Sequence, residues 1–203
     1  MAAKVLLISP YGEELAPHFA DGDMVEWRDE PRLDLHSEDA HKFDWVVSYG
    51  CRQIIHEPWL TIYKNRIINI HISYLPFNRG ADPNFWSWFD NTPKGVSIHL
   101  IDRGMDTGQL IDQTEVKFHS PEKHTLATSY AQLRKIAPIF FEYVWGNIGR
   151  NSYNVEPQKE IFASRTHKSA DKKKWMQMLP LGWDTPVLEV SSLGDMQRKD
   201  TVQ

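Results

Sequence analysis

Residues 69–76 read NIHISYLP, residues 78–80 read NRG, and residues 101–108 read IDRGMDTG. Asn69 and His71 lie two positions apart in an apolar run, and side chains at i and i+2 of a strand point to one face. Asp106 lies in a glycine-containing loop that follows a second apolar run. These stretches predict that an amide, an imidazole and a carboxylate meet beside a sheet.

Apolar runs of strand length alternate with helical patterns along the chain. We predict strands at 5–9, 24–27, 45–48, 66–71, 96–101 and 110–118, and helices at 37–42, 57–62, 83–89 and 125–148, the last kinked at Pro138. This alternation predicts an α/β fold with a mostly parallel sheet flanked by helices. Active sites of such sheets lie beyond the carboxyl ends of the strands, so we expect His71 and the loop 102–106 to meet at that edge.

The composition, 41% hydrophobic and 25% charged, is typical of a globular protein. A net charge of -4 leaves no basic surplus for a nucleic-acid backbone, so we expect no nucleic-acid partner. The single cysteine, Cys51, excludes an intrachain disulfide and a cysteine-based zinc site, and no other ligand spacing predicts a metal. Since no apolar run has the length of a signal peptide or a membrane span, we expect a cytoplasmic protein without a membrane partner.

The composition becomes more polar after Arg150. We predict a catalytic domain over 1–150 and a small C-terminal extension, 151–203, that packs on its core. Residues after about 190 carry few apolar anchors and are expected to be frayed. The long aromatic-rich helix and the tryptophans of the extension suit a homodimer face as well as an intramolecular one, so the oligomeric state stays open.

The three motifs resemble the catalytic core of the 10-formyltetrahydrofolate-dependent formyltransferases. That family is marked by an Asn-x-His strand, a Ser-x-Leu-Pro turn and an Asp-Thr-Gly-like loop, all present here in the same order, and the similarity is clearest over 45–116. The resemblance implies a Rossmann-like fold, 10-formyltetrahydrofolate as co-substrate, and Asn69, His71 and Asp106 as catalytic residues. It also suggests a cis peptide bond between Leu75 and Pro76.

Formyl transfer is acyl transfer to an amine, in which negative charge develops on the formyl oxygen. The Asn69 amide and the His71 imidazole are suitable donors to that oxygen, and a histidine also exchanges protons near neutral pH. Asp106 either orients His71 or accepts the proton of the attacking amine, and the residues alone do not separate these two roles. Taken singly, an Asn-x-His pair is more often structural, and His99, within an apolar strand, is expected to serve the core.

The resemblance also implies binding residues. The segments that hold the pterin of the folate are expected to contribute Arg52, Gln53, Ile54 and Ile55 on one side and Asp102, Arg103, Gly104 and Met105 on the other. Ile54 and Ile55 suit the core equally well. For the acceptor we expect Ser73, Arg79 and Trp86, although Arg79 can instead pair with Asp82 and Trp86 can fill the core.

Departures from the family pattern narrow the range of possible acceptor substrates. Residues 9–14 read SPYGEE, and a proline and two acids replace the glycine-rich phosphate loop of the glycinamide ribonucleotide branch. The methionyl-tRNA branch carries a C-terminal barrel, for which residues 151–203 are too few. The expected acceptor is therefore a primary amine on a nucleotide-linked sugar, most like the nucleotide-sugar N-formyltransferases. The alternatives are another small amine such as glycinamide ribonucleotide, a formyl-folate hydrolase, and a folate-binding relative without activity.

Overall fold

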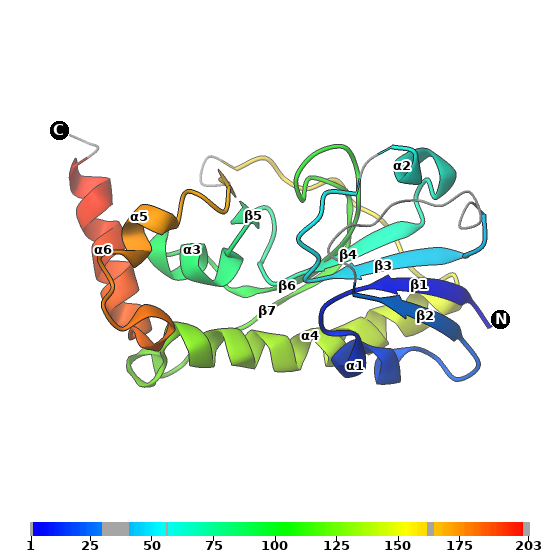
Figure 1. Ribbon diagram of the computed structural model, residues 1–203, viewed down its shortest axis with the longest axis horizontal. Helices are drawn as coiled ribbons and strands as arrows, with labels where there is room; N and C mark the ends of the chain where they lie inside the picture. Colours follow the sequence, from blue (N-terminus) through cyan, green and yellow to red (C-terminus); the bar gives the residue numbers. More distant parts are fainter. Residues whose placement is uncertain (1, 30–40, 56, 162–164, 201–203) are drawn as a thin grey trace. The chain divides into compact units, whose positions relative to one another are not determined.

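The computed structural model describes residues 2–29, 41–55, 57–161 and 165–200 (Figure 1). The chain divides into two compact units that each collect several segments. Unit 1 comprises Met1–His71, Ser97–Gln113 and Ala137–Gln158; unit 2 comprises Ile72–Val96, Thr114–Ile136 and Lys159–Gln203. Each unit draws on residues from both sides of position 150, and our expected helix at 37–42 falls mostly on residues outside those described.

The central sheet has six strands in the order β2-β1-β3-β4-β6-β7. Their bounds are β1 Lys4–Ile8, β2 Met24–Arg28, β3 Trp45–Tyr49, β4 Ile67–His71, β6 Gly95–Leu100 and β7 Leu110–Glu115. The strands β1 to β4 run parallel to one another, as predicted. The sheet is therefore mostly parallel and flanked by helices, and all six predicted strands are present.

Strand β6 departs from the prediction because it runs antiparallel to β4. Leu100, at the carboxyl end of β6, pairs with Ile68 near the start of β4, and Asn69 pairs with His99. Hence His71 and the loop after β6 do not lie at neighbouring carboxyl ends, as we expected. The loop instead folds back over the sheet toward β4.

Helices cover both faces of the sheet in unit 1 (Figure 1). On one face, Leu6 and Ile8 pack in a core cluster with Trp59 of α2 (Trp59–Ile62) and with Tyr63, which follows it. The other face is covered by α1 (Gly12–Leu15), by the 3₁₀ turn η1 (Ala16–His18) and by the unit 1 part of α4 (Leu126–Gly149). α4 continues through Pro138.

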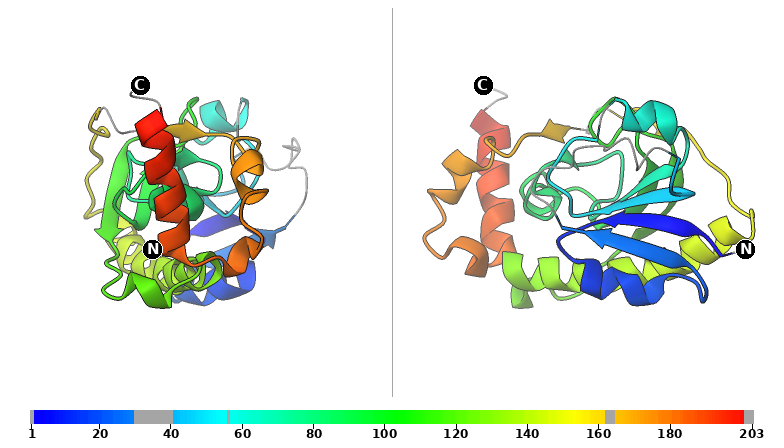
Figure 2. Two further views of the ribbon diagram at one scale, coloured as in Figure 1. Left: turned by 90° about the vertical axis from the view of Figure 1, so that its left-hand side faces the viewer. Right: turned by 45° about the vertical axis from the view of Figure 1, so that its right-hand side comes forward.

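Unit 2 is built around α3 (Pro83–Phe89), which packs on α6 (Val187–Asp200) (Figure 2). Its other elements are β5 (Arg79–Gly80), paired with β8 (Thr166–His167), together with α5 (Lys173–Met176) and the 3₁₀ turns η3 (Pro121–Lys123) and η4 (Gly182–Asp184). The aromatic residues of α3 form its apolar core with Leu126, Val187 and Val190.

Residues 191–200 belong to α6, although we expected the chain to fray after about residue 190. Arg198 donates a hydrogen bond to the carbonyl oxygen of Phe89 at 2.6 Å, and Ser191 donates to that of Trp88 at 3.0 Å. Both carbonyls lie at the end of α3, so polar side chains supply anchors that an apolar pattern does not reveal. No helix among the described residues has the length and apolar character needed to cross a bilayer.

Candidate active site

Four polar side chains of unit 1 gather on one face of strands β4 and β6 and in the loop that follows β6. Asn69 and His71 share a face of β4, as predicted from their spacing. Asn69 lies directly opposite His99 in the antiparallel register. The loop 101–109 then carries Asp106 back to these strands. The three residues predicted to be catalytic are therefore brought together, with His99 as a fourth member.

The Asp106 carboxylate lies between two imidazoles. Its Oδ2 is 3.6 Å from Nδ1 of His71, and its Oδ1 is 3.4 Å from Nε2 of His99. The amide nitrogen of Asn69 donates a hydrogen bond to Oδ1 at 3.2 Å. Only 9% of the His71 side chain and 16% of the Asp106 side chain are exposed, so solvent screens their interaction weakly.

His99 is a core residue, as expected, but its contact with Asp106 was not foreseen. Its Nδ1 lies 2.8 Å from the carbonyl oxygen of Leu100, which can only accept, so this nitrogen carries a proton. In the neutral ring, Nε2 therefore accepts from the Asn69 amide at 3.3 Å; in the cation it donates to Asp106. One signal was available: Ser97 and His99 are polar at i and i+2, which matches the pattern of Asn69 and His71.

Local contacts fold the loop back. Oδ1 of Asp102 accepts hydrogen bonds from the Gly104 amide at 2.9 Å and from the Thr107 hydroxyl at 2.7 Å. Asp106 has a φ of 53°, in the left-handed region. A β-carbon at Gly108 would lie 1.8 Å from the carbonyl oxygen of Leu100, so no larger residue fits this return to the sheet.

The two segments predicted to hold the pterin, 52–55 and 102–105, both belong to unit 1. Arg103 pairs with Glu57 at 3.2 Å, and a Thr61 hydrogen bond and this guanidinium both lower the pKa of Glu57. Ile54 is 69% exposed, whereas Ile55 is 8% exposed and belongs to the core cluster. Arg52 and the residues from Asp102 to Met105 are exposed, and Gln53 is half-buried. Ile54 and Met105 are thus the apolar side chains available to a ligand.

The residues expected to bind the acceptor belong to unit 2. Ser73 is buried and donates its hydroxyl to the carbonyl oxygen of Phe77. Arg79 is half-buried in β5, and Lys172 pairs with Asp82. Trp86 is 4% exposed and stacks on His167 with ring centroids 3.9 Å apart. The peptide bond between Leu75 and Pro76 is cis, as expected.

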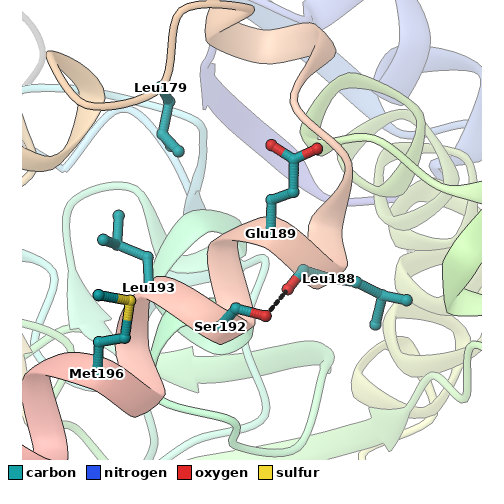
Figure 3. A pocket seen from close by; sticks show the side chains of 6 residues that line it. All are labelled: Leu179, Leu188, Glu189, Ser192, Leu193 and Met196. Atoms are coloured by element: carbon teal, nitrogen blue, oxygen red, sulfur yellow. Dashed lines mark hydrogen bonds between the residues drawn. The ribbon is translucent and has the colours of Figure 1, made fainter.

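A separate apolar groove lies along α6 in unit 2 (Figure 3). Its lining consists of Leu179, Leu188, Glu189, Ser192, Leu193 and Met196. The Ser192 hydroxyl donates to the carbonyl oxygen of Leu188 at 2.9 Å, so it is used within the helix. The groove contains none of the predicted site residues.

The chemistry of the unit 1 cluster is that of proton transfer and of hydrogen-bond donation to a developing negative charge. Burial raises the pKa of the Cys51 thiol, which disfavours the thiolate. Across the described residues, no three His, Cys, Asp or Glu side chains are placed to hold a metal ion. The cluster therefore offers an imidazole for proton exchange and an amide for hydrogen-bond donation.

Comparison with known proteins gives a consistent result. Residues 29–142 match the family model described as "Formyl transferase". A solved structure of the formyltransferase PseJ from Anoxybacillus kamchatkensis, in complex with UDP-4,6-dideoxy-4-formamido-L-AltNAc and tetrahydrofolate, superposes with a TM-score of 0.85 at 39% identity. The match covers 94% of this chain and 99% of that one.

Two curated relatives match shorter stretches. A methionyl-tRNA formyltransferase of Finegoldia magna is 39% identical over 90 residues, which are 44% of this chain and 28% of the relative. A dTDP-4-amino-4,6-dideoxyglucose formyltransferase of Mycobacterium bovis is 34% identical over 109 residues, 52% of this chain and 45% of the relative. The matched region thus spans less than half the length of either curated relative.

Proposed function

The chain belongs to the formyl transferase family, and from this premise we propose that it transfers the formyl group of 10-formyltetrahydrofolate to a primary amine on a nucleotide-linked sugar. The observation that carries the proposal is the position of Asp106 against both Asn69 and His71. This contact assembles an amide donor, an imidazole and a carboxylate on one face of β4.

In the proposed reaction the amine nitrogen attacks the formyl carbon and forms the new C–N bond. The bond from that carbon to the folate nitrogen then breaks, and tetrahydrofolate leaves. The amine loses one proton and the departing nitrogen gains one, so no oxidant or reductant is needed. His71, which lies beside Asp106, is the group we assign to this proton exchange.

Negative charge on the formyl oxygen requires a donor, and we assign this role to the Asn69 amide. Removal of one such donor typically costs ~2.7–4 kcal/mol of transition-state stabilisation. The amide hydrogens of Asn69 point to Asp106 and to His99. Donation to the formyl oxygen therefore requires Asn69 to exchange one of these partners, and His99 becomes unable to accept when it is protonated.

The acceptor class rests on the relatives. PseJ binds a UDP-linked 4-formamido-4,6-dideoxy sugar, and the name of the mycobacterial relative specifies a dTDP-linked 4-amino-4,6-dideoxy sugar. We therefore propose a nucleoside-diphosphate-linked 4-amino-4,6-dideoxyhexose as the acceptor. Arg79 remains a candidate for its phosphates, since a guanidinium fits phosphate oxygens, while the burial of Trp86 favours a core role for that side chain.

The folate is proposed to lie against the segments 52–55 and 102–105. Exposed Ile54 and Met105 would cover the flat pterin, and backbone groups would provide its polar contacts. Ile55 would support this wall from the core.

The test compares acceptors by kcat/KM. Each acceptor is supplied with 10-formyltetrahydrofolate, and the release of tetrahydrofolate is followed. The acceptors are UDP- and dTDP-linked 4-amino-4,6-dideoxyhexoses, glycinamide ribonucleotide and methionyl-tRNA. We expect a sugar nucleotide to be the best substrate. A faster reaction with methionyl-tRNA or glycinamide ribonucleotide would overturn the acceptor class. Formate release without any amine, at an equal rate, would instead show a hydrolase.

A further inference from the structure

The backbone of Asp106 needs external support. Its φ of 53° lies in the left-handed region, which residues with a β-carbon adopt only infrequently. Within the loop, the Asp102 carboxylate accepts from the Gly104 amide and from the hydroxyl of Thr107, the residue after Asp106, but both hydrogen bonds are exposed and neither involves the carbonyl oxygen of Asp106. Such a conformation persists only where surrounding groups hold it in place.

Gln158 supplies this support from a distant part of the sequence. Its side-chain nitrogen Nε2 donates to the carbonyl oxygen of Asp106 at 2.8 Å and to that of Gly108 at 2.8 Å. A side-chain amide has two hydrogens, so both are used on the two sides of the Asp106–Gly108 turn. The carbonyls of the loop are thereby fixed relative to each other.

The main chain beside Gln158 is itself anchored. Glu156 and Leu110 exchange two backbone hydrogen bonds, of 2.8 and 2.9 Å, which join the segment after α4 to the start of β7. Gln158 lies two residues beyond this bridge and is half-buried. Its side chain therefore reaches the loop from a fixed base.

We propose that Gln158 is a positioning residue, which holds the Asp106 carboxylate against His71 and His99 by fixing the backbone of the loop. The expected effect on catalysis rests on the proposed function. The expected effect on the position of Asp106 rests on the geometry alone. Gln158 acts through the Asp106 carbonyl, so its loss should leave substrate affinity nearly unchanged while the reacting groups lose alignment.

Three variants test the proposal. Gln158→Leu removes both donors at similar size, and Gln158→Glu replaces them with oxygens that repel the two carbonyls. Glu156→Gln is the matched control, because Glu156 contacts Leu110 only through its backbone in the hydrogen bonds described and its side chain is exposed. We expect both Gln158 variants to lose kcat roughly 10- to 100-fold, since a misplacement of about 1 Å can cost ~100-fold, with each KM changed less than about threefold.

A second measurement does not require activity. The ring resonances of His71 and His99 in ¹H–¹⁵N spectra should move in Gln158→Leu and stay in place in Glu156→Gln. Unchanged kcat and unchanged resonances in Gln158→Leu would overturn the proposal, as would an equal loss in Glu156→Gln. If the wild type formylates none of the acceptors but the resonances move, the proposed function fails and the positioning role stands.

Discussion

Nε2 of His99 lies 3.4 Å from Oδ1 of Asp106, closer than the 3.6 Å between Asp106 and Nδ1 of His71. The Leu100 carbonyl holds the proton of His99 on its other ring nitrogen. His99 can therefore either accept a hydrogen bond from Asn69 or, as a cation, donate one to Asp106. It thereby couples the hydrogen bonds of the Asp106 carboxylate to those of the Asn69 amide.

Replacing His99 should impair catalysis although no substrate contact is assigned to it. His99→Gln keeps a polar group near the position of Nε2 but cannot become a cation, and we expect kcat to fall about tenfold, as for the loss of ~1.5 kcal/mol from one hydrogen bond to a charged group. His99→Leu should lose more and also unfold at a lower temperature, because the Leu100 carbonyl and the Asn69 amide lose a partner. Steady-state kinetics with thermal melts provide the check. A kcat of wild-type size in His99→Leu would contradict this role.

His71 and Asp106 should act as one unit. His71→Ala or Asp106→Asn alone is expected to lower kcat by ~100- to 10,000-fold, the usual contribution of general acid–base catalysis. The double variant should be little worse than the worse single variant, because each group works through the other. A double-mutant cycle on kcat/KM measures this coupling, and additive losses would show independent roles.

The two neighbouring isoleucines allow a paired test of the folate site. Ile54→Ser should weaken tetrahydrofolate binding and change the free energy of unfolding by less than ~0.5 kcal/mol, because Ile54 is 69% exposed. Ile55→Ser should destabilise the fold by ~2–5 kcal/mol, because Ile55 is buried in the core cluster. Calorimetric titration and chemical denaturation separate the two effects. Unaltered folate affinity in Ile54→Ser would place the pterin elsewhere.

Gly108 should be irreplaceable for steric reasons. Gly108→Ala puts a β-carbon 1.8 Å from the Leu100 carbonyl oxygen, so the loop must shift and Asp106 with it. We expect a loss of kcat of at least roughly tenfold and a lower melting temperature. Gly149→Ala is the control, since nothing lies within 4 Å of its added carbon, and it should stabilise α4 by up to ~1 kcal/mol. Equal behaviour of the two variants would refute the steric argument.

Lys94 should make the free energy of unfolding depend on pH in the alkaline range. Burial lowers its pKa from 10.5 to about 8, so between these values the unfolded chain binds more protons than the folded one and stability rises with pH. Below about pH 8 the ammonium is charged in both states, where it donates to the Thr92 carbonyl at 2.9 Å. Lys94→Met should lose this rise, so its melting temperature should fall relative to wild type between pH 8 and pH 10.5. Lys117→Met is the control, because Lys117 is exposed. If the melting temperatures of Lys94→Met and wild type differ by the same amount at every pH, the lowered pKa of Lys94 is contradicted.

The pattern of residues 69–108 predicted that Asn69, His71 and Asp106 come together, because its signals are local. Alternation along β4 placed Asn69 and His71 on one face, and apolar runs located all six strands. The direction of β6 was not predictable, because an apolar strand of six residues reads the same either way. His99 was assigned only to the core for the same reason, since its contact with Asn69 depends on that direction.

Two other features depend on contacts between distant segments. Gln158 donates to the Asp106 carbonyl from a polar segment. No repeating pattern in that segment distinguishes this glutamine from its neighbours. Arg198 and Ser191 anchor α6 by donating hydrogen bonds to carbonyl oxygens of α3. A hydropathy pattern does not predict such polar contacts. Polar contacts over long sequence separations leave little trace in composition or spacing.

The hydrogen bond from Gln158 to Asp106 spans 52 residues of sequence. During synthesis, β4 and β6 can pair as soon as they leave the ribosome, but the turn at Asp106 cannot receive this donor until residue 158 has emerged. Contacts of high sequence separation also form late in refolding, since loop closure must precede them. The sheet should therefore form before the turn at Asp106 is fixed, and recovery of activity should lag behind recovery of secondary structure.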